Sequence, residues 1–478
     1  MRRRMKLKRI TAVILAVIML LSLSACRTPN EFYHEVILGE TSNSGKKKEK
    51  KKEEKKEEKK EEKSEAKKEE ATEDNTEYAE SENEDFQAYI WDYFVESVTS
   101  DSLTYNSMIK NKDYDPDVVM EEATLGDARM DKDAVTESEE KDNKLYNDLL
   151  EFEDAELTED ERFTYECMKK DMEIDLHIYD NIYFYEPFTP MRGVQENLTS
   201  NFTDFRIGDK EDLDTYITLL EQVRDYFDEL IKFEYEKSDA GFFMSDAVAD
   251  KIIDQCDAFT KNKEDNVLIG SFDERIETLD YVTDDEIDDY KEKNKNAVLD
   301  VVIPAYEDLK ACMEELKGTG KNDEGICGYD GGKEYYENYI FPKFSSSAKT
   351  PSEEIEYMDE RKEELMIELS ALYYSNPDAY EWYIDNSDEA FKIYDEMDTK
   401  ELVNLLQANY MDDYPINGTI PFEIKYMDEA VEKISESTMA YYQVCPVDDP
   451  DYNLICVNGS YKNDRFTAST FQETMWEL

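Results

Sequence analysis

The sequence predicts a mainly α protein, in which one large multi-helix domain carries a small β element near the C-terminus. From Phe86 onward, apolar residues recur mostly at the three- and four-residue spacing of an amphipathic helix. No low-complexity break divides residues 86–478, so we expect a single domain over residues 85–478. With 34 Tyr and 21 Phe, that domain has enough apolar material for a large core.

The expected helices follow one another along the domain. One apolar stripe runs from Phe86 to Val98, and a second runs from Leu213 to Leu230. Thr158 followed by Glu161 predicts a helix start with a capping box.

Later signals complete the expected architecture. Pro304 is expected to kink or begin a helix, since proline lacks the backbone N–H that a helix interior needs. Residues Gly325–Gly332 are expected to form a loop, and Thr350-Pro351 opens another helix. The best strand candidate is the run Asn453–Asn458, which supplies the β element.

Residues 1–26 have the features of a bacterial lipoprotein signal. Six Lys and Arg residues precede an apolar stretch from Ile10 to Leu23, which is shorter than the ~20 residues of a membrane-spanning helix. The following Leu23-Ser24-Ala25-Cys26 resembles a lipobox, in which the cysteine carries the lipid after cleavage. The alternative is an ordinary signal peptide with a chance cysteine. We expect an exported chain held at the cell membrane, on its extracytoplasmic side, by a lipid on Cys26.

Residues 27–84 are expected to form a disordered tether. The stretch 46–70 contains 13 Lys and 10 Glu, and its four-residue repeat would stack like charges such as Lys51 and Lys55 on one helix face. A flexible chain of this length reaches roughly 40–45 Å. The tether therefore holds the domain off the membrane.

The chain is strongly acidic, with a formal net charge of −62. Residues 71–478 hold 36 Lys and Arg against 105 Asp and Glu. This balance argues against a nucleic acid partner, because phosphate backbones are bound by cationic surfaces. A solvated acidic coat is the simplest expectation, and attraction of cations or basic peptides is the alternative.

Histidine and cysteine give little sign of a metal centre. The two histidines, His34 and His177, exclude an imidazole-rich site; His34 lies in the tether, and His177 is expected to be a packed helix residue. Besides Cys26 there are six cysteines, which we expect to be mostly isolated buried thiols. They are Cys167, Cys256, Cys312, Cys327, Cys445 and Cys456, and the sequence leaves open disulfides between the nearest pairs, Cys312/Cys327 and Cys445/Cys456.

The common catalytic motifs are absent or incomplete. Gly332-Lys333 is followed by Glu334, where a phosphate loop needs Ser or Thr. The acids from Asn111 to Glu122 mimic calcium-loop spacing, but Pro116 stands where that loop needs glycine, so we expect an acidic loop. No nucleophile elbow is present. The sequence assigns no catalytic, cofactor-binding or metal-ligating residue.

Several segments together resemble one bacterial family, domain of unknown function 885 (DUF 885). In order, they are Asp101–Thr104, Leu157–Tyr165, Tyr185-Glu186-Pro187, Gly193-Val194-Gln195, Asp212–Tyr216, Gly241–Met244, Val302–Tyr306, Gly332–Tyr336, Thr350–Ile355 and Pro446–Asp449, with Asn453 and Asn458. None is specific alone, but their order extends over roughly residues 86–460.

The family resembles helical zinc peptidases of the HExxH type. Its members carry a His-Glu-x-x-Pro-Gly-His segment, in which two histidines hold zinc and the glutamate activates water. No histidine follows His177 in this sequence, and Glu473 cannot be assigned as the base. Zinc is therefore expected for complete family members and not for this chain.

Three hypotheses follow for the function. The first is a catalytically inactive family member: a truncated or frameshifted lipoprotein, or the front portion of a split metallopeptidase. The second is a non-catalytic lipoprotein, either a scaffold or a peptide binder that uses the strand Asn453–Asn458. A hydrolase that relies on carboxylates alone is the third. Under the first hypothesis, Phe471, Met475 and Trp476 should form a poorly covered apolar face.

Overall fold

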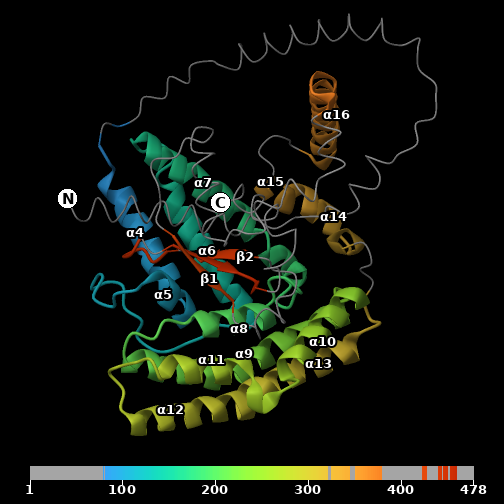
Figure 1. Ribbon diagram of the computed structural model, residues 1–478. Helices are drawn as coiled ribbons and strands as arrows, with labels where there is room; N and C mark the ends of the chain where they lie inside the picture. The colour runs from blue at the N-terminus through green and yellow to red at the C-terminus, as the bar shows by residue number, and fades with distance from the viewer. Residues whose placement is uncertain are drawn as a thin grey trace, which may run out of the picture.

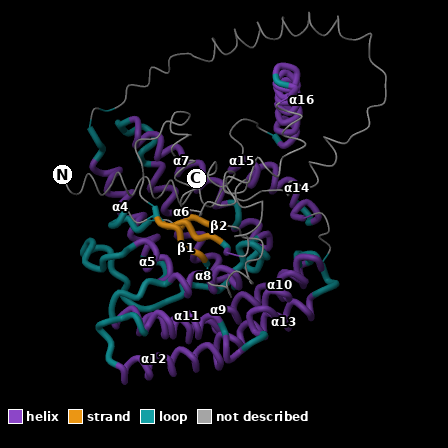
Figure 2. The backbone as a smooth tube through the Cα atoms, viewed as in Figure 1, coloured by secondary structure: helices purple, strands orange, loops and turns teal. Residues whose placement is uncertain are grey.

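The computed structural model describes residues 79, 81–320, 325–344, 350–378, 422–427, 440–443, 445–450 and 453–459. These residues are mostly helical and include one small three-stranded sheet, as the sequence predicts (Figures 1 and 2). Cys26, His34, residues 27–78 of the predicted tether, and Phe471, Glu473, Met475 and Trp476 lie outside the described residues. In the part of the chain that is described, no helix is both long and apolar enough to span a membrane.

The first helices pack around a core of their own. They are α4 (Glu84–Val98), α5 (Ser102–Met108), α6 (Lys132–Leu150) and α7 (Glu159–Leu176). The predicted stripe on α4 buries Phe86, Ile90 and Phe94 against Leu149 and Tyr165. The predicted capping box begins α7, where Thr158 and Glu161 each accept a hydrogen bond from the other's backbone N–H.

A second core lies in the layer of helices at the bottom of Figure 1. Its elements are α8 (Val194–Asp204), α9 (Lys210–Ala240), α10 (Asp246–Thr260), η2 (Lys263–Asp265), α11 (Val267–Ile276), α12 (Asp284–Ala297) and α13 (Ile303–Leu316). The predicted stripe from Leu213 to Leu230 lies on α9 and is almost fully buried. Gly241 ends α9 with a φ of 88°, a left-handed conformation that glycine adopts without strain.

Pro304 begins α13, as expected. It follows η3 (Val298–Val302), which is a π-helical turn. The residues on either side of this turn, Ala297 and Ile303, have right-handed helical dihedrals. The wider turn interrupts the normal helical hydrogen bonding at the point where proline has no N–H to donate. The helix therefore continues without a break from α12 through η3 into α13.

Short helical segments join the two cores to each other and lead from the second core to α16. They are η1 (Tyr179–Phe184), η4 (Gly325–Gly328), α14 (Gly332–Tyr335), η5 (Tyr336–Ile340) and α15 (Phe341–Phe344), followed by α16 (Pro351–Ser375). The start of α16 confirms the predicted Thr350-Pro351 signal. The predicted loop at Gly325–Gly332 is correct only in part, because its first residues form the 3₁₀ turn η4.

The sheet consists of β1 (Glu423–Tyr426), β2 (Ala440–Gln443) and β3 (Leu454–Val457), in the order β1-β3-β2. β3 is the predicted strand, and it pairs in parallel with β1 and antiparallel with β2. Both of its edges are occupied, so its backbone cannot pair with a peptide. A bound peptide could be contacted only by the side chains of β3.

The sheet and the nearby residues 445–450 are held against both helical layers. The backbone N–H of Val447 donates to the Met108 carbonyl over 2.9 Å, and Val447 is buried in the first core. The Asp448 carboxylate accepts the backbone N–H groups of Lys110 and Asn111 over 2.9 and 2.6 Å. This C-terminal region therefore closes over the loop that follows α5.

Candidate functional site

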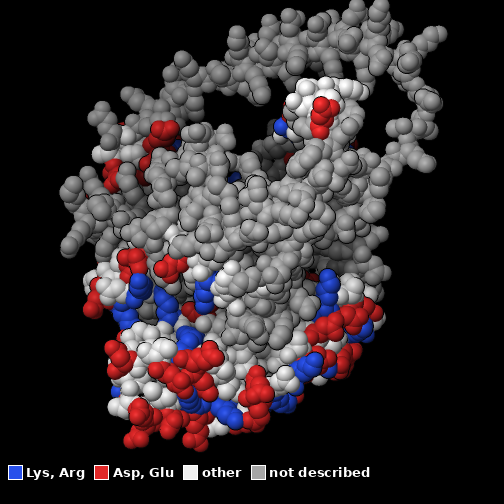
Figure 3. Space-filling model, in the orientation of Figure 1, with Lys and Arg blue, Asp and Glu red and all other residues white. Residues whose placement is uncertain are grey.

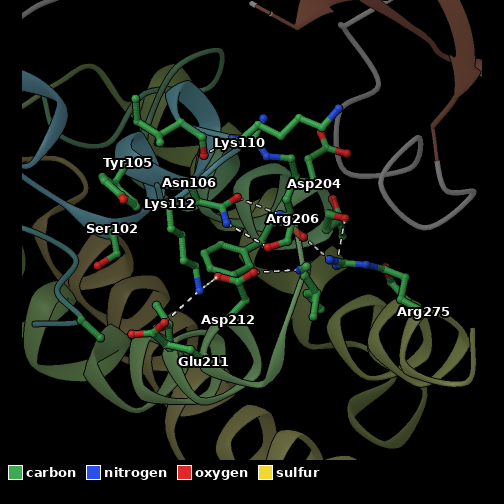
Figure 4. Close-up of a pocket in the computed structure, with 18 of the residues that line it drawn as sticks. Ser102, Tyr105, Asn106, Lys110, Lys112, Asp204, Arg206, Glu211, Asp212 and Arg275 are labelled. Carbon is green, nitrogen blue, oxygen red and sulfur yellow. Dashed lines mark hydrogen bonds and ion pairs between the residues drawn. The ribbon is translucent and has the colours of Figure 1, made fainter. Parts of the chain in front are cut away.

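A cavity of about 970 Å³ lies between the helical layers and the sheet (Figure 4). Its walls come from α5 and the loop after it, the α8–α9 connection, the start of α9, α11, and all three strands. Apolar side chains such as Ile109, Met120 and Met427 line it together with polar and charged ones. Its volume is in the range typical of ligand sites in proteins.

The α8–α9 connection is fixed by Asn106 of α5. Asn106 accepts the backbone N–H of Arg206 over 2.7 Å and donates its amide to the Arg206 carbonyl over 2.9 Å. The Arg206 guanidinium in turn donates to the Ile109 carbonyl over 2.9 Å. These bonds join residues about 100 positions apart and set one wall of the cavity.

Arg275 of α11 binds the carbonyl groups at the C-terminal end of α8. Its Nη1 donates to the carbonyls of Phe202 and Thr203 over 3.1 and 3.0 Å, and its Nη2 donates to the Phe205 carbonyl. A cation here balances the negative end of the helix dipole. Burial lowers the pKa of Arg275, because the charged guanidinium loses hydration.

The sheet is joined to the same helix end through Asp204. One Asp204 oxygen pairs with Lys425 of β1 over 3.0 Å, and the other accepts the Tyr441 hydroxyl of β2 over 2.5 Å. Burial and this carboxylate raise the pKa of Tyr441. Both Asp204 oxygens are therefore engaged by the sheet. The Asp204 charge also acts on Arg275 and raises the pKa of that guanidinium, against the effect of burial.

Lysines at the opposite wall are paired with carboxylates. Lys112 lies 2.8–3.2 Å from oxygens of Asp209, Glu211 and Asp212, the acidic first turn of α9 (Figure 4). Lys110 pairs with Asp449. In Figure 3, basic side chains gather on the left of the molecule, above an acidic lower edge.

Acidic side chains also line the cavity. Glu121, Glu122, Glu211 and Glu274 line it and are exposed. Across the whole lining, five Lys and Arg residues face six Asp and Glu residues. The cavity is thus far closer to electrical balance than residues 71–478 as a whole.

A second cluster of charged groups is buried beside the C-terminal half of α9. Lys237 is fully buried, and its ammonium lies 2.5 Å from Glu186 and 3.5 Å from Glu234. Glu234 is also fully buried, and its Oε2 has no hydrogen-bond partner among the described residues. Tyr329 donates to the other Glu186 oxygen over 3.5 Å. The cluster contains two carboxylates and one cation.

The excess of carboxylates over cations raises the affinity of this cluster for protons. Burial raises the pKa of Glu234 to about 7, with Glu186 adding to the shift and Lys237 opposing it. Burial likewise raises the pKa of Glu186. Glu234 therefore gains and loses its proton near neutral pH.

Three of the family-like segments meet at this cluster. Tyr185-Glu186-Pro187 supplies one carboxylate, and the Phe184 ring beside it contacts the rings of Phe242 and Tyr335. The aromatic residues come from segments next to or within Gly241–Met244 and Gly332–Tyr336. The structure thus gives these segments a shared structural role around a buried ion cluster.

The candidate metal ligands among the described residues are His, Cys, Asp and Glu side chains. Among them, no group of three or more His, Cys, Asp or Glu side chains is arranged to hold a metal ion. His177 caps α7 and stacks on Tyr339 with ring centroids 3.9 Å apart, so it is the packed histidine predicted. These residues do not fit the zinc site that the resemblance implies for complete family members.

The predicted calcium-like residues and cysteines also have positions in the structure. Asn111 and Asp115 each accept a backbone N–H two residues later, as in an ordinary polar loop. All six cysteines after Cys26 are free thiols. Cys256, Cys312 and Cys456 are buried as predicted, whereas Cys327 is exposed.

Sequence reasoning missed the cavity residues. One usable signal was the scarcity of arginine, since residues 71–478 contain eight Arg and two of them, Arg206 and Arg275, line the cavity. Asp204 and Lys237 carried no such signal. Each belongs to an ordinary helical pattern, and its partners are distant in sequence.

Comparisons with known proteins support the resemblance. The family model described as “Bacterial protein of unknown function (DUF885)” matches residues 119–474. A crystal structure described as that of “the putative lipoprotein from Colwellia psychrerythraea” has a TM-score of 0.54 to this chain and is 14% identical in sequence. The similarity covers 78% of this chain and 67% of that one, and it concerns the fold alone. A search of curated proteins finds no match.

Proposed function

Since the chain belongs to the DUF885 family of bacterial proteins, we propose that it is a membrane-anchored, extracytoplasmic lipoprotein that binds peptides in its cavity without cleaving them. The observation that carries the proposal is the cavity of about 970 Å³ between the sheet and the helical layers. Its mixture of apolar walls with a few fixed charged groups suits a short peptide, which has both kinds of surface.

The non-catalytic part of the proposal rests on the sequence. Its two histidines are His34 and His177, and His177 is committed to packing against Tyr339. This sequence therefore lacks the pair of histidines on one helix that an HExxH peptidase requires. The alternatives are a scaffold lipoprotein and the front portion of a split metallopeptidase, which would acquire its metal ligands from a second segment.

Anchoring is tested through Cys26. Replacing it with serine (Cys26→Ser) is expected to move most of the protein from the membrane fraction to the soluble extracytoplasmic fraction, because serine cannot carry the thioether-linked lipid. Cell fractionation and metabolic labelling with a fatty acid measure both effects. Unchanged membrane retention with no labelling of the parent protein would contradict lipid anchoring.

Peptide binding is tested by filling the cavity. Ser271 of α11 lines it and is partly buried, so Ser271→Trp would place an indole in the space a ligand needs. We expect at least about a tenfold loss of affinity for short fluorescent peptides, measured by anisotropy. The matched control, Glu277→Trp, changes an exposed position just after the same helix, outside the cavity.

The same mixtures test the absence of cleavage. Mass spectrometry after prolonged incubation should recover every bound peptide intact. Hydrolysis that persists in a zinc chelator would contradict both non-catalytic hypotheses and favour a carboxylate-based hydrolase. Equal binding by the parent protein and Ser271→Trp would contradict the assignment of the cavity.

A further inference from the structure

We propose that the cavity selects short peptides with a free C-terminal carboxylate, which binds to the Arg275 guanidinium, and with a basic group near the other end. This inference rests on the proposed function and adds the chemistry of the ligand. It follows from the partners of the cationic groups that line the cavity and from the acidic residues beside them.

The Arg275 guanidinium is only partly occupied by hydrogen-bond partners. Three of its five N–H groups donate to the carbonyls of Phe202, Thr203 and Phe205, and the other two have no partner among the described residues. No carboxylate of those residues forms an ion pair with it, although the charge of Asp204, which pairs with Lys425, acts on it from a longer range. Because buried charges in proteins are normally paired, a carboxylate entering the cavity would complete the environment of this guanidinium.

The lysines of the cavity are already neutralised. Lys112 contacts three carboxylates, and Lys425 pairs with Asp204. Lys110 pairs with Asp449. An incoming anion would have to compete with these partners, whereas at Arg275 it would displace no ion-paired carboxylate of the described residues. The fifth cation of the lining, Arg206, is engaged with the Ile109 carbonyl. The geometry therefore points to the Arg275 guanidinium as the anion site.

The acidic residues that line the cavity favour a cationic group on the ligand. Glu274 precedes Arg275 on α11, and neighbouring helix positions do not face the same way, so the carboxylate is exposed while the guanidinium is partly buried. Exposed Glu121 and Glu122 add negative charge. This charge repels a polyacidic ligand and attracts a cationic group. A peptide with a basic residue and a free C-terminus satisfies both regions.

The first experiment changes the ligand and leaves the protein unaltered, so its result does not depend on whether a variant folds. The probe is the tetrapeptide Lys-Ala-Ala-Phe with a fluorophore on an added linker, prepared as the free acid and as the C-terminal amide. We expect the amide to bind the purified mature protein about 10–100-fold more weakly, the range for losing a charge-assisted hydrogen bond. Replacing the lysine of the probe with norleucine should weaken binding several-fold, and added salt should reduce that difference.

Two variants then test whether Arg275 is the group that binds the carboxylate of the probe. In Arg275→Gln, checked for cooperative thermal unfolding, the free acid and the amide should bind equally. If that variant does not fold, the comparison of acid with amide in the parent protein still decides whether the carboxylate matters. The control Arg224→Gln changes an exposed arginine of α9 that pairs with Asp308 away from the cavity, and it should retain the discrimination.

The outcomes separate the two proposals. Equal binding of acid and amide to the parent protein would overturn carboxylate selection while leaving peptide binding intact. Discrimination that survives in a folded Arg275→Gln variant would overturn the assignment to Arg275. Failure of every tetrapeptide to bind would instead contradict the proposed function.

Discussion

Replacing Lys237 with methionine is expected to lower the free energy of unfolding by about 3–5 kcal/mol near pH 7.5, the range for removing one partner of a buried ion pair. The methionine keeps most of the buried aliphatic chain but removes the charge that faces Glu186 and Glu234. Two carboxylates would then share a buried site without a cation. Both must take up protons, which is unfavourable at neutral pH.

The position of the charge can be tested on the same helix. Lys232→Met removes an exposed lysine of α9 that pairs with Glu229 at the surface, and it should change stability by no more than about 0.5 kcal/mol. Urea unfolding followed by circular dichroism measures both variants. A Lys237→Met loss as small as that of Lys232→Met would contradict a buried ion cluster. A loss that shrinks near pH 5 would support it, because the carboxyl groups are then protonated.

The parts of the fold that the sequence predicts are those specified by local patterns. The stripe of α9 and the capping box of α7 need only residues within one or two helical turns of each other. Strand β3 is recognisable because four consecutive apolar residues form it and are all buried. β1 and β2 are four residues each, include polar side chains, and form strands only by pairing with β3. Local pattern cannot supply that pairing.

The site is harder to predict for the same reason. Asn106 positions Arg206, and Lys425 contacts Asp204, across about 100 and 221 residues respectively. A lysine on a helix in an acidic chain is ordinarily a surface residue, so the burial of Lys237 could not be expected from its neighbours. The resemblance includes Glu186 in one of its segments, but only the structure brings this residue to Lys237.

Replacing Glu234 with glutamine is expected to raise the free energy of unfolding near pH 8, by up to about 3 kcal/mol, and to leave it nearly unchanged near pH 4.5. The pKa of Glu234 is about 7 in the folded protein, against an ordinary value of 4.5. A raised carboxyl pKa means that the folded state binds the proton more tightly than the unfolded state. The associated stability is complete below about pH 4.5 and is lost as the pH rises through 7.

Glutamine is uncharged at every pH, so it removes this loss and keeps an oxygen that can accept from Lys237. It also leaves Lys237 and Glu186 as a one-to-one pair, the arrangement that the proton maintains at lower pH. Because the chain carries many other acids, the decisive quantity is the difference between variant and parent across pH, measured by urea unfolding. The exposed neighbour variant Glu236→Gln should show no such pH-dependent difference. If Glu234→Gln gave the same change in stability at pH 8 and pH 4.5, Glu234 would not be the group that takes up a proton near pH 7.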